Sequence, residues 1–168
     1  MSGVTKHIFE HELDDILSMW NTEIKSVTPL LPRKYTKADI IALLKYYYPH
    51  EWQSVESKYK YYRTKDKYLK RRFGKSRYNM SEPELLIQRV SAFKKIFSES
   101  YKYAHWNAYS ERNRVDSSVK LWEARKYKID RINSKIEIAL SKTQQVTPSF
   151  INQLIGLYER KNTTQKDK

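Results

Sequence analysis

Three side chains near the start of the chain have the types and spacing of a metal site. His7, Glu10 and His11 match the pattern H-x-x-E-H. On a helix the two histidines would share a face and could bind zinc, with Glu10 as general base. A third zinc ligand would have to come from an acidic side chain that belongs to no recognised motif. The apolar residues beside the motif also account for a helix without metal. We therefore predict no metal and no cofactor, and keep a small zinc hydrolase as an alternative.

Other enzyme signatures are weak in this sequence. His105-Trp106-Asn107 has the His-x-Asn order of a nuclease fragment, but the strand–helix cradle that such a fragment needs is not predicted. The chain has 3 glycines and no cysteine, so a glycine-rich phosphate loop, a disulfide and a thiolate metal site are excluded. The sequence alone therefore predicts a protein that is not an enzyme.

The strongest signal is a concentration of positive charge between residues 58 and 77. This stretch holds ten Lys or Arg side chains and a single acid, Asp66. Like charges spaced along one helix repel each other, which indicates a polyanionic partner that relieves the repulsion. Cations would neutralise phosphates, while tyrosines beside them would stack on bases. The predicted nucleic-acid-binding residues are Lys58, Lys60, Tyr61, Arg63, Lys65, Lys67, Tyr68, Lys70, Arg71, Arg72, Lys75 and Arg77.

The charge is distributed unevenly along the chain. The whole chain carries +14, but residues 1–57 hold six basic and eight acidic side chains, a net of −2. Residues 58–168 hold 27 and 11, a net of +16. The acidic N-terminal helix is therefore expected to serve another purpose, such as docking a protein partner.

Helical spacing and capping signals define the elements that would position these residues. Apolar residues at helical spacing predict a first helix over residues 5–26, which ends at the Pro-containing segment 28–32. Thr36 and Asp39 form a capping box for a second helix, which ends near Pro49.

A long basic helix is predicted next, over about residues 49–73. Proline is favoured in its first turn, and Gly74 is placed to end it. Asp66 falls in its apolar seam, where we expect an ion pair with Lys70 or Arg63, the alternative being a buried contact that fixes register with a partner helix.

The second half of the chain is also predicted to be helical. Ser81 and Glu84 form another capping box, for a helix that reaches Tyr109 or beyond. Residues 112–114 are predicted to break it, another helix follows to about residue 140, and Thr147 begins a last short helix. Two aromatic side chains of this half are expected in the core: Trp106 and Trp122.

The second and third helices have the outline of a helix-turn-helix motif. In that interpretation the start of the third helix would face the major groove of DNA. The outline is unspecific, because any pair of consecutive helices produces it. The residues that would face the groove are His50, Gln53, Ser54 and Ser57.

Together these signals predict an all-α protein with about six helices in an irregular bundle, one long basic helix and no sheet. We predict one helical domain over residues 1–160, with a weakly acidic part (1–57) and a basic part (58–160), followed by a polar tail (161–168). No apolar run predicts a signal peptide or a membrane span, so the protein is expected in the cytoplasm, without a membrane partner.

The predicted function is that of a non-enzymatic protein that binds DNA or RNA through the phosphate backbone. The alternative is a helical adaptor or structural subunit of a larger nucleoprotein or mobile-element assembly, with the N-terminal helix docking a protein partner.

Overall fold

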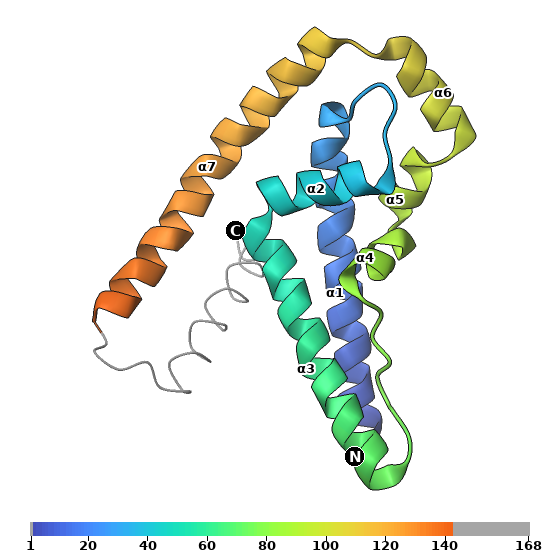
Figure 1. The fold of residues 1–168 in the computed structure, drawn as a ribbon, viewed down its shortest axis with the longest axis vertical. Coiled ribbons are helices and arrows are strands. Elements are labelled where there is room, and N and C mark those ends of the chain that lie inside the picture. The colour runs from blue at the N-terminus through green and yellow to red at the C-terminus, as the bar shows by residue number, and fades with distance from the viewer. Residues whose placement is uncertain (1, 143–168) are drawn as a thin grey trace.

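The computed structural model describes residues 2–142, and this part of the chain contains helices and no strand (Figure 1). The all-α prediction is confirmed. The predicted helix from Thr147 and the polar tail lie outside the described residues, and the domain boundaries stay a prediction. The α-helices are α1 (Ser2–Val27), α2 (Lys37–Tyr47), α3 (Pro49–Phe73), α4 (Pro83–Leu86), α5 (Ser91–Ile96), α6 (Glu99–Ala108) and α7 (Glu111–Ser141), and the 3-10 helices are η1 (Thr28–Leu30) and η2 (Ile87–Arg89).

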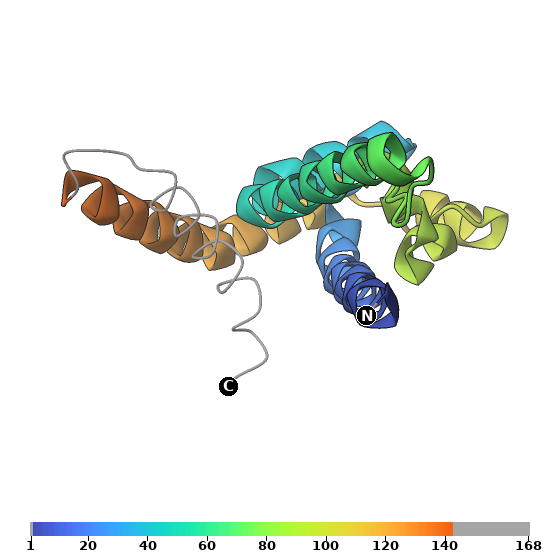
Figure 2. The ribbon, with the colours of Figure 1, turned by 90° about the horizontal axis from the view of Figure 1, so that it is seen from below.

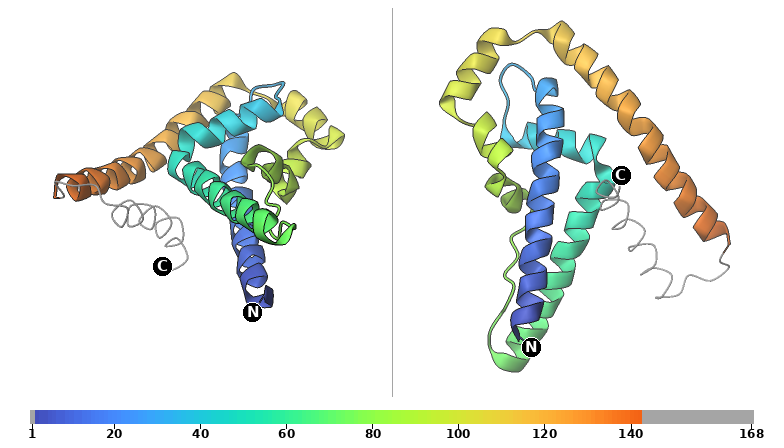
Figure 3. Two further views of the ribbon diagram at one scale, coloured as in Figure 1. Left: turned by 60° about the horizontal axis from the view of Figure 1, so that its bottom comes forward. Right: turned by 180° about the vertical axis from the view of Figure 1, so that it is seen from behind.

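Two long helices, α1 and α3, lie side by side and bring the start of the chain close to the end of α3 (Figures 1 and 3). Trp20 of α1 stacks on Trp52 of α3 with ring centroids 5.5 Å apart, in the middle of the main hydrophobic core. Leu44 of α2 and Leu86 of α4 are fully buried in the same core. Each such side chain contributes about 1.5–3 kcal/mol through burial, so this junction fixes how α1, α2 and α3 are arranged.

The local signals around α2 and α3 are confirmed. The Thr36 backbone N–H donates to the Asp39 carboxylate at 2.7 Å, as a capping box requires. Pro49 stands in the first turn of α3, and Gly74 ends the helix with a left-handed φ of 75°. A Cβ at Gly74 would meet no atom within 4 Å, so the backbone angle alone explains why glycine suits the position.

The prediction of one helix from the Ser81 capping box to Tyr109 is wrong. The chain forms α4, η2, α5 and α6 instead, with extended backbone at Val90 (ψ 131°) and Ser98 (ψ 146°). Asn21 of α1 supplies the acceptor that starts α5, because its Oδ1 accepts a hydrogen bond from the Ala92 N–H at 3.0 Å. The breaks let short helices wrap their apolar side chains onto α1, which one straight helix could not do.

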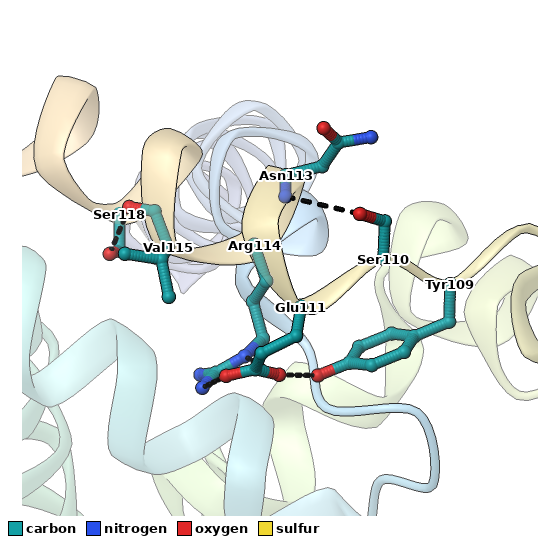
Figure 4. Close-up of polar contacts among 7 residues, drawn as sticks. All are labelled: Tyr109, Ser110, Glu111, Asn113, Arg114, Val115 and Ser118. Atoms are coloured by element: carbon teal, nitrogen blue, oxygen red, sulfur yellow. Dashed lines mark hydrogen bonds and ion pairs between the residues drawn. The ribbon is translucent and has the colours of Figure 1, made fainter.

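The predicted break at residues 112–114 is also wrong, because α7 runs through it. The helix begins one residue after Ser110, whose Oγ accepts a hydrogen bond from the Asn113 N–H at 3.4 Å (Figure 4). Glu111 receives hydrogen bonds from Arg114 and from the Tyr109 hydroxyl in the first turn (Figure 4). Arg114, followed by Tyr109, lowers the pKa of Glu111 to about 2, so the carboxylate stays charged near the positive end of the helix dipole.

Helix α7 leaves the body of the molecule as a long arm (Figure 2). Its first half packs against η1 and α2, whereas its far end extends away from α1 and α3 (Figures 1 and 2). Among the described helices, none has a stretch long and apolar enough to cross a membrane.

Candidate functional site: a basic cleft at the end of helix α3

The predicted binding residues lie along the outer side of α3 and on the loop after it. All of them are exposed except Lys58, which is half-buried. The two tyrosines of this row are held by cations of their own helix: the Lys65 ammonium lies 4.7 Å from the Tyr61 ring centroid, and Arg72 donates to the Tyr68 hydroxyl at 2.6 Å. In this outer row of α3, cations and tyrosines therefore contact one another in pairs. The role of the row in nucleic-acid binding stays a prediction.

Asp66 does not form the ion pair predicted from its position in the seam. Its carboxylate accepts hydrogen bonds from three consecutive backbone N–H groups, those of Arg77 (2.8 Å), Tyr78 (2.9 Å) and Asn79 (2.7 Å). Burial by itself would raise the pKa of Asp66, but the three N–H groups and the nearby Arg77 outweigh it and hold the pKa below its usual value. Asp66 therefore fastens the loop after α3 onto the helix.

A cleft opens where the start of α1, the end of α3 and this loop meet. Its volume is about 370 Å³. The lining combines two apolar side chains, three cations and a hydroxyl, and contains no carboxylate: Lys6, Leu69, Phe73, Lys75, Ser76 and Arg77. The sequence predicts the two basic residues after Gly74 but not Lys6, because nothing in it shows that the first turns of α1 reach the end of α3.

The floor of the cleft is a packed hydrophobic surface. Leu69 packs against a small aromatic cluster of Phe9, Tyr62 and Tyr78, in which the ring centroids of Phe9 and Tyr62 are 4.7 Å apart. The Tyr62 hydroxyl donates to Glu12 of α1, which joins α1 and α3 beneath the cleft. At the rim, Arg77 donates to the Thr5 hydroxyl at 3.4 Å, so the loop is tied to α1 as well as to α3.

A second group of charged side chains is buried where α7 meets α1 and α3. Arg125 of α7 donates to the Glu51 carboxylate at 2.7 Å and to the Tyr47 carbonyl at 2.8 Å, and it lies over the Tyr48 ring. Burial, followed by the charge of Glu51, raises the pKa of Glu23 in the same group well above its usual value. This group anchors α7 to the body.

These buried charges were not predicted, although the sequence contains a signal for them. Glu23 lies between Trp20 and Val27 on the apolar face of α1, and Arg125 lies between Trp122 and Ile129 on the seam of α7. A charged residue in an apolar seam indicates a buried polar contact, as Asp66 also shows.

The structure corrects the helix-turn-helix interpretation. His50 is buried, with an exposed fraction of 7%, so it cannot reach a DNA groove. Gln53 and Ser57 are exposed, but the surface proposed to face the major groove loses its first residue, His50.

Among the described residues, no three His, Cys, Asp or Glu side chains come together to hold a metal ion, and His11 of the H-x-x-E-H motif lies 3.5 Å from Asp15.

The prediction that the two tryptophans of the second half lie in the core is wrong. Trp106 is 50% exposed and lies under the Arg33 guanidinium, and Trp122 is 38% exposed and stacks on Tyr46. Both cover the edges of the bundle, where α6 and α7 pass over α2 and the loop before it.

Comparison with known proteins gives one informative similarity. The chain is 26% identical over all 168 of its residues to a protein of Cytobacillus dafuensis described as a candidate cyclic ADP-D-ribose synthase, TIR2. The chain spans 44% of the length of that relative. No family model matches the chain, and no solved structure matches it.

This similarity overturns the functional predictions made from the sequence. A relative named as a synthase contradicts the prediction of a non-enzymatic nucleic-acid-binding protein, the nucleoprotein-adaptor alternative, and the statement that the chain is not an enzyme. The charge of α3 was a poor guide, because positive charge identifies an anionic partner but not its chemical class. A protein partner for the N-terminal helix stays a prediction.

Proposed function

We propose that this chain acts in the synthesis of cyclic ADP-D-ribose, as the helical region of a TIR-type signalling enzyme. The observation that carries the proposal is the similarity to TIR2, which extends over the whole chain. A match of that extent is more informative than a short shared motif, because it includes the core positions as well as the surface.

The helical architecture supports a division of labour within such an enzyme. Dinucleotides are commonly bound at the carboxyl ends of strands in an open α/β sheet. Residues 2–142 contain no strand, and more than half of the relative lies outside the match. We therefore assign ring closure to the region that corresponds to the unmatched part of the relative, with this helical region acting on the nucleotide or on that domain.

The chemistry of the proposed reaction can be followed through its products. Cyclisation of an ADP-ribosyl donor such as NAD⁺ joins the adenine ring to the ribose carbon that held nicotinamide, and it releases nicotinamide and a proton. Attack by water at the same carbon gives linear ADP-ribose instead. Separate measurement of the two products therefore shows whether cyclisation has occurred.

A chimera tests the proposal. The segment of TIR2 that matches this chain is replaced by the full 168-residue chain, and cyclic ADP-ribose formed from NAD⁺ is measured by mass spectrometry. The controls are unaltered TIR2 and TIR2 with the matching segment deleted. We expect the chimera to restore cyclic product above the deletion variant, and a chimera no more active than the deletion variant would contradict the proposal.

A further inference from the structure

We infer that the cleft at the end of α3 binds the pyrophosphate and adenine of an ADP-ribose-type nucleotide. This inference rests on the proposed function, which it deepens by naming a ligand class and a site. Nothing in the similarity to TIR2 assigns this cleft a role.

The charges of the cleft fit a pyrophosphate. Lys6 approaches from α1, and Lys75 and Arg77 approach from the loop after α3, so three cations from two separate segments surround one space. No carboxylate lines the cleft, although the nearby Asp66 carboxylate, which accepts from three backbone N–H groups, offsets part of the Arg77 charge. An arginine fork can bind two phosphate oxygens at once, while the lysines act as point charges beside it.

The apolar side of the cleft fits a base. Phe73 lines the cleft with an exposed fraction of 65%, and the Arg72 guanidinium lies 5.5 Å from its ring centroid, which leaves the rest of this exposed ring to contact a base. Leu69 continues the apolar surface toward the aromatic cluster beneath. Base stacking on an aromatic ring contributes about 1–3 kcal/mol, so Phe73 would account for a preference for nucleotides over inorganic anions.

The loop that carries two of the cations is held before any ligand arrives. Asp66 binds the backbone of residues 77–79, Gly74 makes the left-handed turn out of α3, and Thr5 contacts the Arg77 side chain. Preorganised cations bind an anion without the entropic cost of ordering a loop. Asp66 thus acts as a positioning residue for the cleft.

The shape favours a small ligand over a polymer. A volume of about 370 Å³ lies in the range of sites for small organic ligands and cofactors, which begins at roughly 300 Å³. The tyrosines of the outer row of α3 lie outside the cleft and already interact with cations of their own helix, because the Lys65 ammonium lies over the Tyr61 ring and Arg72 donates to the Tyr68 hydroxyl.

Isothermal titration calorimetry on the full chain tests the inference. The ligands are ADP-ribose, NAD⁺ and cyclic ADP-ribose, with inorganic pyrophosphate and adenosine as the separate halves. We expect at least one of the three nucleotides to bind more tightly than either half. Comparison of the three distinguishes a site for donor, product or hydrolysed nucleotide.

Variants locate the binding. Arg77→Ala and Phe73→Ala should each weaken nucleotide binding by about tenfold, the effect of one charged hydrogen bond or one stacked base. Phe73→Ala should leave pyrophosphate binding unchanged, whereas Arg77→Ala should weaken it. The matched controls are Lys60→Ala and Tyr61→Ala, which remove an exposed cation and an exposed ring of α3 outside the cleft. Circular dichroism checks that each variant keeps its helices.

Three results would overturn the inference. The first is no nucleotide binding at ~1 mM, and the second is an equal loss of nucleotide affinity in the cleft variants and the control variants. The third is an unrelated oligonucleotide that binds more tightly than the nucleotides and whose binding is weakened equally in the cleft variants and the control variants. An active chimera without cleft binding would refute the cleft and leave the proposed function standing. Nucleotide binding in the cleft together with an inactive chimera would refute the proposed function and leave the cleft as a nucleotide site.

Discussion

Replacement of Asp66 by Asn tests whether one carboxylate holds the loop that shapes the cleft. Asn has the same size and keeps one oxygen, which can still accept from the Arg77 and Tyr78 N–H groups. The second oxygen becomes an NH₂ group, which faces the Asn79 N–H that donated to it at 2.7 Å. Two donors then point at each other, and Asn79 stands in a left-handed conformation (φ 47°) that leaves it little freedom to move away.

The expected cost follows from these contacts. Loss of one hydrogen bond to a charged group costs about 1.5–3 kcal/mol, and the two retained bonds weaken because their acceptor becomes neutral. We expect Asp66→Asn to lower the free energy of unfolding by about 3 kcal/mol at pH 7. For a chain of this size that corresponds to a fall in Tm of about 10 °C.

The effect should depend on pH with a definite sign. The pKa of Asp66 is lower in the folded protein than its ordinary value of 3.8. Its carboxylate therefore stabilises the fold fully above pH 3.8 and loses that contribution as the pH falls through the lower, folded pKa. The difference between the unaltered protein and Asp66→Asn should shrink over that acidic range.

Urea unfolding, followed by tryptophan fluorescence and circular dichroism, measures both effects. Asp14→Asn on the exposed side of α1 is the matched control and should change stability by less than about 0.5 kcal/mol. The reasoning fails if Asp66→Asn costs less than about 1 kcal/mol or if its effect is the same at every pH. Weaker nucleotide binding by a folded Asp66→Asn protein would further support its positioning role.

Three other substitutions test separate parts of the fold, each by urea unfolding. Gly74→Ala forces a side chain into a left-handed conformation and should cost about 1 kcal/mol, with Gly74→Asn milder; no difference between the two would contradict this. Glu23→Gln should stabilise the protein above pH 4.5, the ordinary pKa of Glu23, because burial raises that pKa and penalises the charged form; a loss of stability at pH 7 would refute it. Arg125→Ala leaves Glu51 buried without its partner and should cost about 3–5 kcal/mol, and adding Glu51→Gln should recover part of that cost; a loss below about 1 kcal/mol would show that α7 is held by other contacts.

The sequence predicts the first half of the fold well because its signals are local. The capping pair at Thr36 and Asp39, Pro49 in a first turn and Gly74 at a helix end act on neighbouring backbone groups. Their effect does not depend on the rest of the structure. The boundaries of α2 and α3 could therefore be predicted closely.

The second half could not be predicted in this way because distant residues decide it. Asn21 of α1 caps α5 from 71 positions away, and no local pattern contains that information. Apolar spacing over residues 86–101 suits one helix, but burial of both Ile87 and Ala92 requires the chain to turn around α1. Tertiary packing thus overrides the helical period there.

The candidate site could be predicted only in part, because distant segments of the chain form it together. Composition showed the cations after Gly74, but the cleft needs Lys6, which only the pairing of α1 with α3 brings near. The charge count also led to the wrong function. The count predicted a nucleic-acid surface, whereas the relative TIR2 is described as a candidate cyclic ADP-D-ribose synthase, which contradicts a non-enzymatic function.

The most direct measurement is the partition of products made from NAD⁺ by TIR2 in which this chain replaces the matching segment. Cyclic and linear ADP-ribose differ by one molecule of water, so mass spectrometry separates them in a single run. We predict cyclic product above the level of the segment-deleted variant. Linear ADP-ribose alone, or no turnover beyond that variant, would contradict a role for this helical region in cyclic ADP-ribose synthesis.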